Sequence, residues 1–253
     1  MTFSVPNQRA SAPDAAALAA ALQWWRDAGV EYSFADKAAA WLALPEAEAK
    51  SAPAVYTKPL PVPLSPRVLV GGEVARWPVD LAGFQTWWLT EPALDAGQVS
   101  GRIALRGVAG ATLMILVDHP EAEDQEQLLS GPLGKLLGAM LAALGVTPDQ
   151  AYFASALPRH TPYPDWTDLT DAGLPELTRH HVALVAPKRL ICFGPHASSL
   201  LGHDPAKSAE SFAKITHSHG AVSALMAPGL EDLMGRPRVK ARLWQALLAW
   251  PDA

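Results

Sequence analysis

Residues 114–145 read MILVDHPEAEDQEQLLSGPLGKLLGAMLAALG, and this stretch predicts a strand, a loop and a helix in succession. The apolar run Leu113–Val117 has the length of a buried strand, and a polar, acidic segment follows it. Apolar residues then recur at helical spacing over Gly134–Leu144. Open α/β sheets place their ligands at such strand-to-helix loops, at the carboxyl ends of the strands. We therefore expect a ligand site in the loop that begins at Asp118.

The rest of the body repeats this alternation. Further strands are predicted at Ala151–Leu157 and Arg189–Phe193, and Phe212–Thr216 and Ala221–Met226 are candidate strands. Alternating strands and helices imply a parallel sheet with helices on both faces, joined by right-handed crossovers. The predicted fold class is therefore α/β. The further helices predicted in the body are Asp80–Thr90, Leu174–Val185, His196–Leu201 and Arg238–Trp250.

Composition divides the chain into three stretches. Residues 1–50 are rich in alanine and predict a helical arm, with helices at Ala15–Arg26 and Phe34–Leu44. Residues 51–66, SAPAVYTKPLPVPLSP, predict an extended linker, because proline fixes φ and blocks helix formation. Residues 67–253 form the predicted α/β domain. The tryptophans of the arm require burial, on the body or on a partner: Trp24, Trp25 and Trp41.

Charge and cysteine content narrow the function classes. The net charge of −5 argues against strong non-specific DNA binding, which depends on clustered lysine and arginine. Cys192 is the only cysteine, which excludes a disulfide scaffold and a multi-cysteine metal centre within one chain. No apolar run of about 18 residues and no signal-peptide pattern occurs, so we expect a cytoplasmic protein without a membrane span. One basic patch, either a solvated helix start or a contact to the DNA backbone, comprises Arg236, Arg238, Lys240 and Arg242.

A succession of short motifs runs through the body. The motifs are LVDHPEAEDQ (116–125), LLSGPLGKLL (128–137), AYFAS (151–155) with LPRHTPYP (157–164), APKRLICFGPHASSLLG (186–202) and MAPGLEDLMGRPRVKARLW (226–244). Their order and spacing resemble the uracil-DNA glycosylase superfamily, closest to its iron–sulfur (family 4) branch. The resemblance implies a three-layer α/β/α fold around a central, mainly parallel four-stranded sheet, with the helical arm added at the N-terminus.

The resemblance also implies a site that holds a base flipped out of DNA. The family's water-activating acid corresponds to His119, and Asp118 is the adjacent carboxylate, so both are candidate catalytic residues. His119 is alternatively a histidine that caps the loop or faces solvent. Arg159 and His160 follow a strand, at the edge of the sheet where Asp118 is expected, and are candidates for contact with a ligand or with DNA phosphate. Arg236 and Arg238 are further candidates for contact with the DNA backbone. The implied base pocket comprises Pro120, Glu121, Leu129, Ser155, Ala227 and Pro228.

Three pocket positions depart from the chemistry of the family. Leu129 stands in place of a phenylalanine that stacks on the base, and leucine offers no aromatic face. Ser155 replaces the asparagine that reads the uracil edge, and one hydroxyl cannot reproduce bidentate amide recognition. Ala227 replaces a histidine that stabilises developing charge on uracil, a contribution typically worth several kcal/mol.

No cofactor and no metal is predicted. The family's cluster cysteines correspond to positions near Pro92, at Ala156–Pro158 and at Leu174, where no cysteine occurs, and a cluster requires about four thiolates. His217 and His219 could share one face of a strand and bind a metal, but a solvated loop is the simpler interpretation. An acidic helix entry, rather than a Mg²⁺ site, is the simpler explanation of Glu121, Glu123, Asp124 and Glu126.

Two functional hypotheses remain. In the first, the chain is catalytically degenerate and acts as a DNA-associated or repair-accessory binding module, with DNA or a repair protein as its partner. In the second, it is an active glycosylase that hydrolyses the N-glycosidic bond of a flipped uracil or another deaminated base, with Asp118 or His119 activating water. The combined losses at Leu129, Ser155 and Ala227 favour the first hypothesis.

Overall fold

The computed structural model describes residues 14–29, 69–204 and 211–250. The chain divides into two compact units, Met1–Val62 and Pro63–Ala253. The predicted helix at Phe34–Leu44, with Trp41, and the predicted linker at 51–66 lie outside the described residues.

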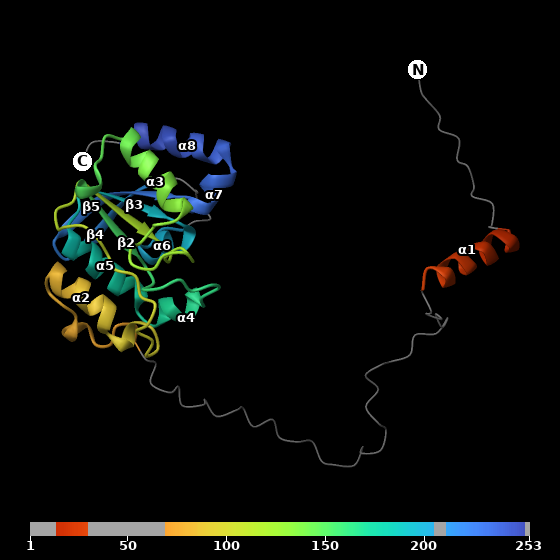
Figure 1. Ribbon diagram of the computed structural model, residues 1–253, viewed down its shortest axis with the longest axis horizontal. Coiled ribbons are helices and arrows are strands. Elements are labelled where there is room, and N and C mark those ends of the chain that lie inside the picture. The colour runs from red at the N-terminus through yellow and green to blue at the C-terminus, as the bar shows by residue number, and fades with distance from the viewer. Residues whose placement is uncertain (1–13, 30–68, 205–210, 251–253) are drawn as a thin grey trace, which may run out of the picture. The chain divides into compact units, whose positions relative to one another are not determined.

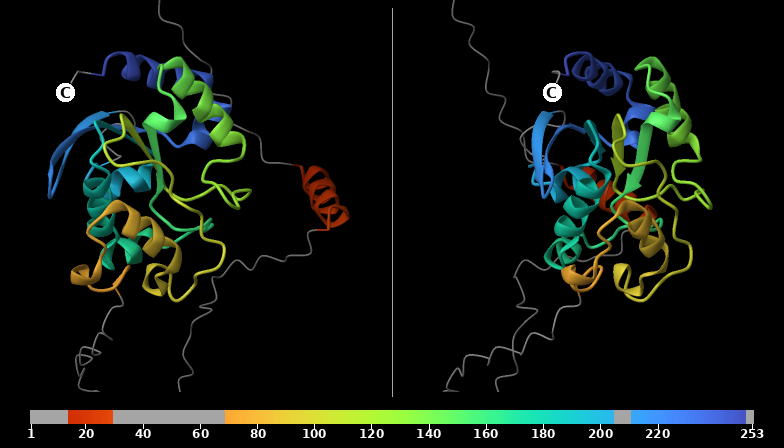
Figure 2. Two further views of the ribbon diagram at one scale, coloured as in Figure 1. Left: turned by 60° about the vertical axis from the view of Figure 1, so that its left-hand side comes forward. Right: turned by 90° about the vertical axis from the view of Figure 1, so that its left-hand side faces the viewer.

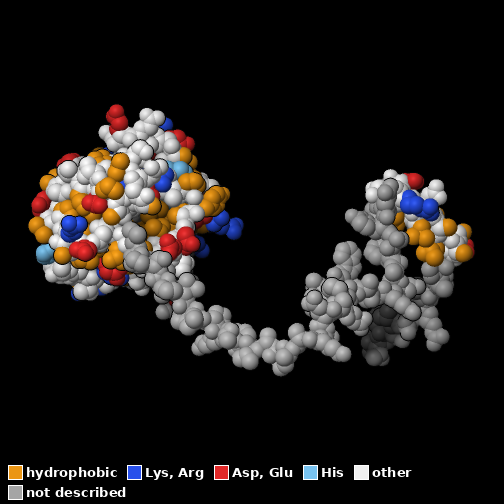
Figure 3. All heavy atoms as spheres, turned by 90° about the horizontal axis from the view of Figure 1, so that it is seen from below, with side chains coloured by type: hydrophobic (Ala, Val, Ile, Leu, Met, Phe, Trp, Pro, Cys, Tyr) orange, Lys and Arg blue, Asp and Glu red, His pale blue; other side chains and the backbone are white. Residues whose placement is uncertain are grey.

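Helix α1 (Ala15–Asp27) confirms the helix predicted at the start of the arm. The Asp14 side chain accepts a hydrogen bond from the backbone N–H of Ala16 at its beginning. No residue of α1 is buried, and Trp24 and Trp25 are 62% and 51% exposed. Hydrophobic side chains gather visibly on the surface of this helix (Figure 3). That the arm packs on the body or on a partner stays a prediction.

The body is built on one sheet of five strands, in the order β2-β1-β3-β5-β4 (Figure 1). Four strands pair in parallel, and β4 alone runs antiparallel, paired with β5. The expectation of four strands is therefore wrong by one. The hairpin that turns at Ser218 and His219 adds β4 as a partly exposed edge strand. The strands are β1 (Leu113–Val117), β2 (Ala151–Ser155), β3 (Arg189–Phe193), β4 (Ser211–His217) and β5 (Gly220–Ala227).

The helices predicted in the body are confirmed to within a few residues at their ends. Three helices, α4, α6 and α7, have six residues each, too few to show a clear helical period, and only α6 was predicted, from its place after a strand and a glycine turn. The α-helices of the body are α2 (Leu81–Thr90), α3 (Pro132–Ala143), α4 (Trp166–Asp171), α5 (Leu174–Val185), α6 (Pro195–Leu200), α7 (Leu230–Gly235) and α8 (Pro237–Leu248). Short 3₁₀ helices are η1 (Val74–Arg76), η2 (Pro92–Leu94) and η3 (Pro148–Gln150).

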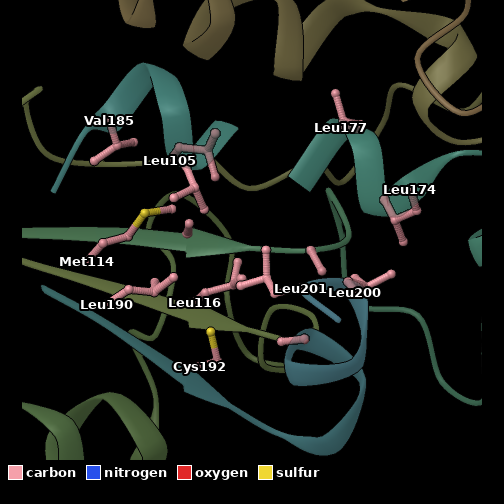
Figure 4. Close-up of a cluster of buried hydrophobic side chains, with 14 of the residues drawn as sticks. Leu105, Met114, Leu116, Leu174, Leu177, Val185, Leu190, Cys192, Leu200 and Leu201 are labelled. Carbon is pink, nitrogen blue, oxygen red and sulfur yellow. The ribbon is translucent and has the colours of Figure 1, made fainter. Parts of the chain in front are cut away.

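Helices cover both faces of the sheet, and a hydrophobic core fills each interface (Figure 2). Successive residues of a strand point to opposite faces, so alternate residues of β1 enter different cores. Met114 and Leu116 pack with Leu190, Cys192 and residues of α5 and α6 (Figure 4). The neighbouring residues of β1 pack with α3, α7 and α8 on the other face. Within the described parts of the body, no helix is long and apolar enough to cross a membrane.

A buried histidine makes the body sensitive to acid. The Nε2 atom of His181 lies 2.9 Å from the Tyr152 hydroxyl, and the Phe84 ring centroid lies 4.5 Å from the imidazole. Burial, with a smaller contribution from the charge of His180, lowers the pKa of His181 to about 3. As the pH falls, His181 is therefore protonated in the unfolded chain before it is protonated in the folded chain. The stability contribution of a neutral His181 is complete above its ordinary pKa of 6.5 and is lost on the way down to about 3.

We expect His181→Gln to flatten the pH dependence of the free energy of unfolding between pH 6.5 and 4.5. The protonation of His181 in the unfolded state contributes a slope of up to about 1.4 kcal/mol per pH unit in the wild type. Urea titrations at several pH values measure this slope. His180→Gln, one position earlier on α5, is the matched control and should retain it. An unchanged slope in His181→Gln would show that other groups set the acid sensitivity.

Candidate functional site

A cavity of about 410 Å³ opens at the carboxyl ends of β1 and β3. Leu129, Phe193 and Leu230 contribute apolar surface to its wall. Its position matches the edge of a parallel sheet at which ligands bind in open α/β folds. The polar side chains that line it are Asp118, His119, His196, Glu231, Asp232 and Arg236.

Asp118 follows β1 directly, and its carboxylate is held by the start of α6. Oδ1 accepts a hydrogen bond of 2.6 Å from the backbone N–H of Ala197. Gly194 permits this contact: its φ is +109°, and a Cβ atom there would lie 2.6 Å from the carboxylate. Burial raises the pKa of Asp118, while the Ala197 N–H and the charges of His196 and His119 oppose the rise. The carboxyl group thus joins the end of β1 to the turn after β3.

His119 and His160 share one hydrogen-bond acceptor. The Nδ1 atom of each ring lies 2.9 Å from the Pro120 carbonyl oxygen, and the two rings meet edge-on with their centroids 5.0 Å apart. A carbonyl oxygen only accepts, so each Nδ1 carries the hydrogen, and in the neutral ring Nε2 is left as an acceptor. His119 lines the cavity and could use this atom as a base. Pro120 itself is buried and does not line the cavity.

The buried acidic residues of the loop hold the backbone. Glu121 accepts hydrogen bonds from the N–H groups of Gly131 and Leu133 at 2.9 and 2.7 Å, at the beginning of α3. Asp124 accepts from three N–H groups between 2.7 and 2.9 Å, those of Glu121, Leu129 and Ser130. Within the acidic run, Glu121 therefore holds the entry of α3 and Asp124 anchors the loop, whereas Glu123 and Glu126 are exposed. Within residues 14–29, 69–204 and 211–250, no group of three potential metal ligands occurs.

Of the residues assigned to the base pocket, Leu129 alone lines the cavity. Its φ is +58°, the left-handed region, and its side chain is buried. The buried Ser155 hydroxyl donates to the Leu157 carbonyl oxygen at 2.7 Å. The Ala227 carbonyl oxygen accepts from the Gly194 N–H at 3.0 Å, and Pro228 follows it, half-buried, at the end of β5. Ser155, Ala227, Pro228 and Glu121 do not line the cavity.

The arginines assigned to DNA contact differ in their surroundings. Arg159 forms an ion pair with Asp95, and this contact raises the pKa of the guanidinium. Arg236 is exposed and lines the cavity, and its Nη1 lies 3.0 Å from a carboxylate oxygen of Asp232. Arg238 is exposed on α8. One arginine thus faces two carboxylates, Asp232 and Glu231, at the mouth of the cavity.

Three polar residues of this cavity were not predicted as site residues from the sequence. His196, on α6, stacks on Trp166 of α4, with centroids 4.4 Å apart and planes within 7°. Its position directly after the turn behind β3 was the available signal. Glu231 and Asp232 lie on α7, which was not predicted.

A scan against models of protein families finds no match to this chain, and a search of curated proteins finds no match either.

The cavity can accept a small ligand of mixed polarity, with hydrogen-bond acceptors at His119 and the α7 carboxylates and one cation at Arg236.

Proposed function

We propose that this chain is a divergent uracil-DNA glycosylase-like protein that has lost base excision and acts as a binding module, associated with DNA or with a repair protein. The observation that carries the proposal is the lining of the cavity: of the residues that the resemblance assigns to the base pocket, Leu129 alone reaches it. The Asp118 carboxylate lines the cavity as well, and its Oδ1 accepts the Ala197 N–H, which gives it a structural role at the start of α6.

The chemistry around the cavity supports the same proposal. Leu129 provides an apolar wall without an aromatic face, and the Ser155 hydroxyl donates its hydrogen bond to the Leu157 carbonyl oxygen. Within the described parts of the chain, no side-chain amide lines the cavity to read a uracil edge. The parallel order of β2, β1, β3 and β5, with helices on both faces, is compatible with a three-layer glycosylase-like fold, which is part of the proposal.

Electrostatics determine where each class of partner could bind. Glu231 and Asp232 at the cavity repel phosphate, so DNA contact would depend on Arg236 and Arg238 at the start of α8. Helix α1 suits a protein partner, because its apolar side chains are exposed and only Arg26 adds a basic group. A helix that binds membrane surfaces is usually rich in lysine and arginine, so the single basic residue of α1 does not favour a membrane as its partner.

Fluorescence anisotropy with labelled single- and double-stranded oligonucleotides at several salt concentrations tests the DNA contact. We expect weak, salt-sensitive binding, and we expect Arg238→Ala to reduce the salt slope by about 1 for one lost phosphate contact. Arg179→Ala, an exposed arginine on α5, is the control. Absence of salt-sensitive binding would remove the DNA role and leave association with a protein.

The alternative is an active glycosylase, and one observation favours it. His119 lines the same cavity as Asp118, and its Nε2 is left as an acceptor in the neutral ring. Histidine is a suitable base near neutral pH. Direct measurement of base release separates the two functions.

A further inference from the structure

A second cavity, of about 270 Å³, lies between α3 and the edge of the sheet at β2. Leu137, Leu141 and Phe153 provide its apolar surface, and Arg106 is the only charged residue that lines it among the residues that the structure describes. Leu129 lines this cavity and the first one, so its side chain belongs to the walls of both.

The Arg106 guanidinium forms no ion pair within the described parts of the chain. It lies over the Phe153 ring, with Cζ 3.8 Å from the centroid, and its Nε atom is buried without a hydrogen-bond partner. Burial lowers the pKa of this guanidinium, and the charge of Asp124 opposes the shift. A half-buried cation without a direct acceptor is destabilising, and an anion in contact with it would offset that cost.

The backbone fixes Arg106 in this position before any ligand arrives. Arg106 and Phe153 exchange backbone hydrogen bonds of 3.2 and 2.8 Å, so the segment runs beside β2 like an extra strand. Gly107 follows with φ +124°, and a Cβ atom there would lie 2.8 Å from the Ala151 carbonyl oxygen. The guanidinium is therefore presented to the cavity by rigid structure, which lowers the entropic cost of binding.

Two small residues of α3 leave room for a ligand. Gly138 and Ala142 are spaced four residues apart on one side of this helix, and both line the cavity. A Cβ atom on Gly138 would meet nothing within 4 Å, so the space beside it is open. The volume is slightly below the range of about 300 to 1,000 Å³ that is typical of small-molecule sites.

From this geometry we infer that the second cavity binds a small monocarboxylate with a short apolar body. The apolar body would occupy the space between α3 and the Phe153 ring, and the carboxylate would accept hydrogen bonds from the two terminal nitrogens of Arg106, Nη1 and Nη2. Arginine binds carboxylates in this bidentate way, with higher geometric specificity than a point charge. The site is independent of the proposed role in repair.

Isothermal titration calorimetry of the full chain with octanoate tests the assignment. We expect saturable 1:1 binding, with octanol of the same chain length at least about tenfold weaker because it lacks the charge. Arg106→Gln should weaken octanoate binding at least about tenfold, and Arg106→Lys should recover only part of it. Arg179→Gln, an exposed arginine on α5, is the matched control and should bind as the wild type does.

Gly138→Leu gives a second, independent variant. Its side chain would fill the open space beside α3, so octanoate binding should disappear while the far-ultraviolet circular dichroism and the cooperative thermal transition remain. Equal affinities for octanoate and octanol, or octanoate binding that survives both Arg106→Gln and Gly138→Leu, would overturn the assignment. Failure of octanoate to bind the wild type would overturn it as well.

Discussion

Gly134→Ala is expected to destabilise the body by more than about 3 kcal/mol, at or beyond the upper end of ordinary overpacking costs. A Cβ atom at this position would lie 1.7 Å from the Leu129 carbonyl oxygen and 2.5 Å from its carbon. The carbonyl cannot withdraw easily, because Leu129 is in the left-handed region and Asp124 holds its N–H at 2.8 Å. The collision therefore requires movement of α3 or of the loop.

Thermal and urea denaturation measure the effect, and a fall of roughly 10 °C in Tm is expected for a domain of this size. Gly138→Ala, one turn later on α3, is the matched control. Its new methyl group meets nothing within 4 Å, so replacing a helical glycine should stabilise the protein by about 0.5 to 1 kcal/mol. Equal effects of the two substitutions would contradict the close approach of α3 to Leu129.

Asp124→Ala should also be strongly destabilising, by about 3 kcal/mol or more, since each buried donor left without an acceptor costs about 1 to 3 kcal/mol. The carboxylate accepts from the N–H groups of Glu121, Leu129 and Ser130, and also from the Ser130 hydroxyl at 2.8 Å. Its removal leaves these donors without a partner and releases the loop between β1 and α3.

Glu123→Ala provides the control for the loss of a carboxylate from the same loop. Glu123 is exposed, and surface substitutions of this kind are usually within about 0.5 kcal/mol of neutral. Asp124→Asn should fall between the two, because one acceptor oxygen remains. If Asp124→Ala unfolds in urea within 1 kcal/mol of the wild type, the carboxylate does not anchor this loop.

The elements that could be predicted from the sequence are those with a strong apolar pattern. The five apolar residues of β1 and the periodic helix Leu174–Val185 have the bounds that the pattern predicts. Helix α7 has six residues between Gly229 and Arg236 and shows no clear period. The antiparallel edge strand β4 was a candidate, but the strand number came from the family resemblance and omitted it.

The sequence predicts where the candidate site lies in the fold, but it does not predict which contacts the residues of the site make. Asp118 and His119 come directly after a buried strand, and the edge at which a parallel strand ends follows from the fold. Hydrogen-bond partners depend on tertiary geometry, which sequence spacing does not give. The Ala197 N–H reaches Asp118 from 79 residues away, and the Ser155 hydroxyl turns to the Leu157 carbonyl instead of a ligand.

We propose that the cavity beside Asp118 does not excise bases. Its most direct test is a single-turnover assay with excess protein and oligonucleotides that carry uracil, hypoxanthine or xanthine, single- and double-stranded. Abasic sites are revealed by cleavage in hot alkali, and an active glycosylase serves as the positive control. We expect no release above the no-protein background. Release by the wild type that is lost in His119→Ala or Asp118→Asn would contradict the account and establish an active enzyme.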